Sequence, residues 1–146
     1  PDLDRMYTTY FYERLGNLLN KDGAMSVQST SPYHAKRAFL SIGKTIRAAG
    51  FNQVEQYRQN IPSFGEWGWS LATHSRTSSR RRLIDMDGVN MRDNQWLTID
   101  LLVAAFEFPG DFFNELEHIE VNHLGQNRIY RYHDDAWHRD MGIYRD

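Results

Sequence analysis

The segment Ile61–Thr73 carries the residue types in this chain that are best suited to binding chemistry. It groups aromatic rings around one carboxylate, with glycines that let the backbone approach a ligand closely: Phe64, Glu66, Trp67 and Trp69, with Gly65 and Gly68. An organic cation is attracted both to the faces of aromatic rings and to a carboxylate. The segment therefore predicts a binding site for a cation such as an amine.

Composition excludes several other classes of site. The 146 residues are enough for one domain, and 17 Lys and Arg against 19 Asp and Glu give a net charge of -2. That balance argues against a nucleic-acid partner, and we interpret the run Arg80–Arg82 as a solvated surface, with anionic lipid or phosphate as the alternative. Without cysteine there is no disulfide, thiolate zinc site or cysteine nucleophile. The histidine pairs His118/His123 and His133/His138 are not spaced as metal ligands, so we expect no metal.

The first half of the chain alternates helices and strands. A 3.6-residue apolar stripe predicts a helix over Asp4–Leu19, and a second helix runs from about Tyr33 to Ala49 with Ser31 as its N-cap. Between them lies a short strand, Ala24–Ser29. Strands Phe51–Asn60 and Trp67–Thr73 follow, and the turn between them predicts an antiparallel pair. This is α/β patterning.

The second half is less regular. We expect residues 76–97 to be a linker or surface excursion, turn-like around Gly88. A short helix capped by Thr98 follows, then helical turns at Phe112–Leu116 and Asp134–Arg139. Alternation in Arg128–Tyr132 predicts a strand between those turns. The predicted domains are 1–75, a linker at 76–97 and a C-terminal extension at 98–146.

The blocks Leu3–Tyr12, Met25–Pro32 and Ile61–Trp69 together resemble a spermidine synthase, or polyamine aminopropyltransferase, of the long bacterial branch. The resemblance extends over nearly the whole chain. It implies the C-terminal half of a Rossmann-like, methyltransferase-type sheet that ends in an antiparallel hairpin, plus a small C-terminal extension.

The resemblance also implies an activity. Such enzymes transfer an aminopropyl group from decarboxylated S-adenosylmethionine to putrescine, with no metal or other cofactor. It places the nucleoside-binding loop and the catalytic acid upstream of Pro1, so we expect no catalytic residue in this chain and no activity from it alone. Neither Asp2 nor Asp4 is expected to be the general base. A membrane tether through an N-terminal region is a further implication. Separately, the absence of cysteine makes a reducing cytosol the expected location, and a sheet cut between strands would expose an edge, so we expect a homo-oligomer.

Five residues are predicted to contact the substrate. Gln28 matches the family's substrate-contacting glutamine, and it ends a strand where open α/β sheets bind ligands. Phe64 matches an aromatic wall of the polyamine pocket but lacks the hydroxyl that several relatives carry. Glu66 either faces the distal ammonium or is a solvated turn carboxylate. Tyr7 is close enough to reach the same cleft, and of Trp67 and Trp69 we expect one in the core and one, Trp67, at the crevice.

Two alternatives stay open at this point. The acceptor could be another amine, such as spermidine, cadaverine or agmatine. The chain could also be a non-catalytic interaction module derived from the same fold, which binds partners through its aromatic surface.

Overall fold

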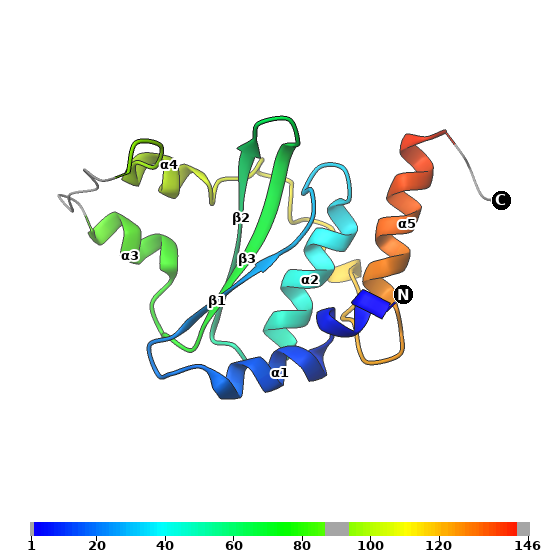
Figure 1. Cartoon of the computed structure of the whole chain (residues 1–146), viewed down its shortest axis with the longest axis horizontal. Coiled ribbons are helices and arrows are strands. Elements are labelled where there is room, and N and C mark those ends of the chain that lie inside the picture. The colour runs from blue at the N-terminus through cyan, green and yellow to red at the C-terminus, as the bar shows by residue number, and fades with distance from the viewer. Residues whose placement is uncertain (1, 87–93, 143–146) are drawn as a thin grey trace.

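A three-stranded antiparallel sheet organises the molecule (Figure 1), and the computed structural model describes residues 2–86 and 94–142. The strands are β1 (Ala24–Gln28), β2 (Gln53–Ile61) and β3 (Gly65–Thr73), in the order β1-β3-β2. Gln28 lies opposite Trp69, and β2 pairs with β3 from Gln53–Thr73 to Ile61–Gly65. The predicted antiparallel pair is confirmed, with β3 beginning at Gly65 rather than Trp67.

Helix α2 (Lys36–Ala48) packs against one face of the sheet. It buries a continuous apolar stripe: Ala38, Phe39, Ile42 and Ile46. The ring of Phe39 lies so close to Gly68 of β3 that only a glycine fits there. The predicted helix is confirmed, but it begins later than Tyr33. Ser31 is not its N-cap, because the Ser31 hydroxyl accepts from the His34 amide in the turn before the helix.

The helix predicted over Asp4–Leu19 is two helices, η1 (Asp2–Tyr7) and α1 (Thr9–Leu18). Thr8 separates them. Its buried hydroxyl accepts from the amide of Phe11 (3.3 Å) and donates to the carbonyl of Arg5 (3.0 Å). A threonine that caps a helix in this way has extended backbone dihedrals, so the apolar stripe continues while the helix is interrupted.

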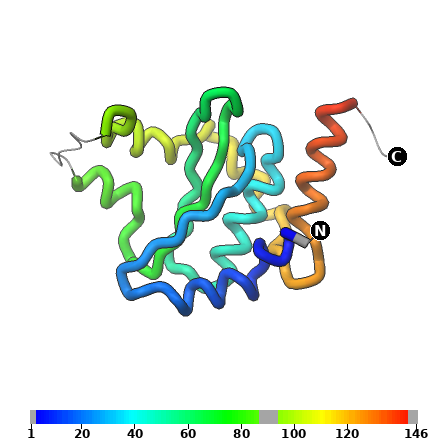
Figure 2. The backbone as a smooth tube through the Cα atoms, in the orientation of Figure 1, coloured from blue at the N-terminus to red at the C-terminus, as the bar shows by residue number. Residues whose placement is uncertain are grey.

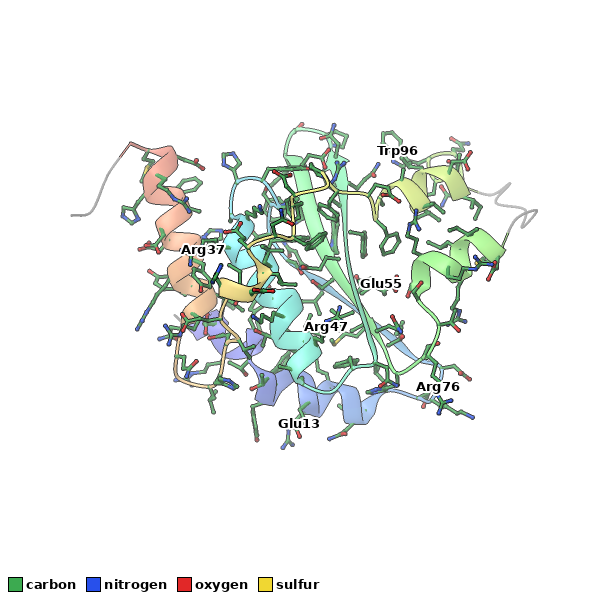
Figure 3. All side chains as sticks on the ribbon, turned by 180° about the vertical axis from the view of Figure 1, so that it is seen from behind. Glu13, Arg37, Arg47, Glu55, Arg76 and Trp96 are labelled. Carbon is green, nitrogen blue, oxygen red and sulfur yellow. The ribbon has the colours of Figure 1, made fainter. Side chains whose placement is uncertain are left out.

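Helices α3 (Ser79–Asp85) and α4 (Ile99–Ala104) lie on the other side of the strands. The segment expected to be a linker or surface excursion contains α3, a helix with no buried residue, which Ser78 caps by accepting from the amide of Arg81 (3.1 Å). Thr98 caps α4 as predicted. The turn expected around Gly88 lies outside the described residues. Figure 3 shows Trp96, beside α4, at the end of the molecule away from α5.

Helix α5 (Arg128–Asp140) replaces the strand predicted for Arg128–Tyr132, and that prediction is wrong. Its buried residues, Ile129, Tyr132 and Ala136, recur at helical spacing. Five alternating residues fit either structure, and packing of this face against α2 favours the helix. The Arg37 guanidinium lies 4.6 Å from the centre of the Tyr132 ring, on the side of α2 that faces α5 (Figure 3).

The C-terminal extension shares the core of the preceding residues. The short helix η2 (Leu116–His118), just after the turn expected at Phe112–Leu116, leads towards α5. Side chains from this region join the cluster built by α2 and the sheet: Phe112, Ile119, Ile129, Tyr132 and Ala136. In Figure 2 the extension brings the start of α5 (orange) beside η1 (blue). Within residues 2–86 and 94–142, every helix is too short or too polar to cross a lipid bilayer.

Candidate functional site

A cavity of about 560 Å³ lies where η1, the end of β1, α2 and α5 meet, and we call it the η1–α5 pocket. Apolar and aromatic side chains form most of its wall, with a few polar groups among them. The lining residues include one carboxylate and no lysine or arginine. Its residues are Leu3, Asp4, Tyr7, Gln28, Thr30, Ala38, Ile42, Trp67, Ile129, Tyr130 and His133.

Three of the predicted substrate residues line this pocket together. Gln28 is the last residue of β1, Tyr7 the last of η1, and Trp67 lies in β3, so three separate elements bring them to one place. Burial raises the pKa of the Tyr7 hydroxyl, which therefore keeps its proton near neutral pH. A protonated phenol and a carboxamide both offer a donor and an acceptor to an amine.

The other two predicted residues do not line the pocket. Phe64 is 73% exposed in the β2–β3 hairpin and reaches the pocket only through Trp67, with ring centroids 5.7 Å apart. Glu66 forms an ion pair with Arg58 at 2.8 Å. Because that carboxylate already has a cation beside it, Glu66 does not supply the free negative charge that the sequence suggested.

Trp67 lines the pocket as expected, but the expectation that the other tryptophan lies in the core is wrong. Neither Trp67 nor Trp69 belongs to the buried core. Trp69 stacks on Tyr57 with ring centroids 5.6 Å apart and lines a second cavity of about 600 Å³, beside α3 and α4. The buried positions at this end of β3 are instead Gly68 and Ser70, which alternate with the two tryptophans, and the Phe39 ring of α2 packs against Gly68.

Sequence reasoning missed the contribution of the two ends of the chain. Asp4 of η1 and three residues of α5, Ile129, Tyr130 and His133, complete the wall. Tyr130 and His133 are three positions apart, which places them on one side of a helix but on opposite faces of a strand. The helical spacing of Ile129, Tyr132 and Ala136 was the signal that could have revealed them.

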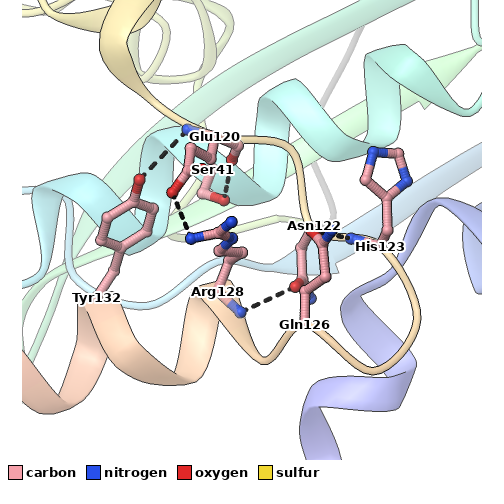
Figure 4. A network of polar contacts seen from close by, with 7 residues as sticks. All are labelled: Ser41, Glu120, Asn122, His123, Gln126, Arg128 and Tyr132. Carbon is pink, nitrogen blue, oxygen red and sulfur yellow. Dashed lines mark hydrogen bonds and ion pairs between the residues drawn. The ribbon is translucent and has the colours of Figure 1, made fainter.

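Asn122 holds these two parts of the wall together, and Figure 4 shows its contact with Arg128 at the start of α5. Its side chain is fully buried and donates to Asp4 Oδ2 (2.8 Å) and to the carbonyl of Tyr7 (3.0 Å). Its Oδ1 accepts from the amide of Arg128 at the start of α5 (2.9 Å). Asp4 Oδ1 in turn accepts from the amide of Tyr130 (2.9 Å). One buried amide thus fixes η1 relative to α5.

The part of the chain that the structure describes contains no set of side chains arranged as metal ligands. Over those residues, no group of three or more His, Asp or Glu side chains is arranged to hold an ion. The polar groups of the η1–α5 pocket are instead suited to hydrogen bonding and to holding positive charge.

Known proteins have sequences similar to this one. The Spermine/spermidine synthase domain matches residues 2–83. A polyamine aminopropyltransferase of Shewanella oneidensis is 47% identical over 143 residues, which are 98% of this chain and 25% of that protein. One from Leptospira interrogans is 32% identical, over 94% of this chain and 26% of that protein. The chain therefore spans about a quarter of the length of these curated relatives.

Solved structures share the fold. The spermidine synthase of Thermotoga maritima matches with a TM-score of 0.60 and 18% identity, over 77% of this chain and 39% of that one. A spermidine synthase in complex with the transition-state analogue AdoDATO matches with a TM-score of 0.61, 18% identity, and 78% and 40% coverage. The predicted methyltransferase-like fold is confirmed. With the domain match over more than half of its residues, the chain belongs to the spermine/spermidine synthase family.

Proposed function

We propose that this chain forms the acceptor-amine side of a polyamine aminopropyltransferase. The acceptor is putrescine, and the donor is decarboxylated S-adenosylmethionine, which acts as a co-substrate. The proposal rests on family membership and on one observation, that Gln28, Tyr7 and Trp67 converge on a single pocket. These three are among the five residues that the sequence predicts to contact the substrate.

The chemistry asks little of these residues beyond binding and orientation. The lone pair of a neutral amine attacks the aminopropyl carbon next to the sulfonium, the carbon–sulfur bond breaks, and neutral methylthioadenosine leaves. The attacking nitrogen then releases a proton to a base, which we place upstream of Pro1. Gln28 and Tyr7 hold the amine in line with the donor, and holding reactants in this way lowers the barrier substantially.

The test uses the full-length protein in which this chain occurs. Incubation with decarboxylated S-adenosylmethionine and putrescine should release methylthioadenosine and form spermidine. Chromatography measures both products. The 146-residue chain by itself should show neither turnover nor a thermal shift with putrescine. Turnover measured separately with cadaverine, agmatine and spermidine, and compared with turnover of putrescine, identifies the acceptor. A full-length protein that turns over none of these amines would support the non-catalytic interaction module instead.

The sequence also predicted a cytoplasmic location, a homo-oligomer and a membrane tether. These three properties of the whole protein stay predictions. Sedimentation of the full-length protein, with and without detergent, tests the oligomer and the tether together.

A further inference from the structure

We infer that Asp4 is the carboxylate that binds the distal ammonium of the acceptor amine. This inference rests on the proposed function and adds a residue to it. The sequence suggested Glu66 for that role, but Glu66 is paired with Arg58 and lies outside the η1–α5 pocket. Asp4 is the one acid among the residues that line the pocket.

Asp4 is buried and has no ion-pair partner among residues 2–86 and 94–142. The residue is 5% exposed, and none of the ion pairs formed within the described ranges includes it. A buried carboxylate is costly unless a positive group compensates it, and proteins rarely keep one unpaired. Since the cavity beside Asp4 is lined by no lysine or arginine, a cationic ligand in that cavity can supply the missing charge.

The hydrogen bonds of Asp4 leave it able to bind a cation. Its two oxygens accept from neutral donors, the Asn122 amide at 2.8 Å and the Tyr130 backbone at 2.9 Å. A carboxylate can accept about four hydrogen bonds, so capacity remains for an ammonium. The start of α5 contributes roughly half a positive charge, which stabilises the carboxylate without neutralising it.

Aromatic rings complete the surroundings of a cation. Tyr7, Trp67 and Tyr130 line the same pocket as Asp4, and ring faces attract an ammonium that has lost part of its water. Gln28, at the end of β1, lies on the sheet side of that pocket. A diamine can therefore extend from Gln28, where its nucleophilic end reacts, towards Asp4, which holds its charged end.

The experiment compares two acceptors on the full-length enzyme. Putrescine carries a second ammonium, and n-butylamine has the same carbon chain without it. Asp4→Asn removes the charge and should lower the putrescine-to-butylamine ratio of kcat/KM by about 10- to 100-fold, as expected for a charged hydrogen bond. Because both amines are assayed on one preparation, partial unfolding lowers both rates alike and leaves the ratio unchanged.

Three further variants make the result decisive. Asp4→Ser keeps an oxygen that can accept from Tyr130 and should lower the ratio in the same way. Asp22→Asn, an exposed acid in a turn, is the matched control and should leave the ratio at the wild-type value. Glu66→Gln tests the rival residue. An unchanged ratio in both Asp4 variants, or a ratio that falls with Glu66→Gln instead, overturns the inference while wild-type turnover still supports the proposed function. A wild-type enzyme that aminopropylates neither amine overturns both.

Discussion

Replacing Asn122 with alanine should be among the most destabilising single changes in this chain. The substitution removes the side-chain amide that joins η1 to α5 and keeps the backbone bonds of residue 122. Those bonds are the donation to Thr45 Oγ1 (2.9 Å) and the acceptance from the Thr9 amide (3.1 Å). The change therefore isolates what the side chain contributes.

The magnitude follows from the three groups that lose their partner. The carboxylate of Asp4, the carbonyl of Tyr7 and the amide of Arg128 each lose a hydrogen bond of 2.8 to 3.0 Å. Buried groups left unsatisfied cost about 1–3 kcal/mol each, with charged groups at the upper end. Allowing for partial access of water, we expect a loss of about 3–5 kcal/mol in the free energy of unfolding, a large fraction of a typical domain's stability.

Urea denaturation of the 146-residue chain measures this loss. With a slope of about 2 kcal/mol per molar, the midpoint should fall by roughly 1.5–2.5 M. Asn114→Ala is the control, because Asn114 is exposed and its side chain makes no hydrogen bond within the described ranges. A loss below about 1 kcal/mol for Asn122→Ala would refute the view that this amide joins η1 to α5.

Three other predictions follow from particular contacts. Gly68→Ala would place a methyl group against the Phe39 ring and 2.9 Å from a backbone carbonyl, so it should cost about 2 kcal/mol or more, whereas Gly110→Ala meets no atom within 4 Å and should be tolerated in the same thermal melts. Burial, with the nearby Tyr7 and Asp4 charges, raises the pKa of Tyr12 well above its usual value. The unfolded chain therefore loses this proton first, and stability should fall as pH rises above about 10. In urea denaturation at neutral and alkaline pH, Tyr12→Phe should show a smaller fall in the midpoint than the wild type. The variant should be no less stable at pH 7, since within the described residues the buried hydroxyl has no partner. An equally steep fall in the variant would contradict this explanation. Finally, β1 pairs along one edge only within the described sheet, so the chain should self-associate, and a monodisperse monomer in sedimentation would count against an exposed edge.

Much of the first half of the fold could be predicted because its local signals agree with its packing. The stripe of α2 and the hairpin of β2 and β3 use periodicities that only one element type satisfies over their length. Signals failed where they were short or polar. Helix α3 buries no residue, so it has no apolar stripe, and only the Ser78 cap and the Arg81–Asp85 pair mark it.

The site was predictable only in part, because part of it depends on contacts between the two ends of the chain. Gln28 could be placed from its position at the end of a strand. Glu66 could not be excluded from sequence, since the hairpin register places it opposite Asn60 and brings its partner Arg58, two positions along β2, within reach across the pair of strands. Asp4 and Asn122 are 118 positions apart, and no local pattern links residues at that separation.

That separation has a consequence for biosynthesis. Ribosomes add about 5–20 residues per second, so η1 waits on the order of 6 to 24 seconds before Asn122 is even polymerised. The wall of the η1–α5 pocket can thus be completed only after the sheet has been synthesised, and it stays open until α5 has emerged. Premature termination within α5 would remove part of this wall and part of the core that α5 shares with α2.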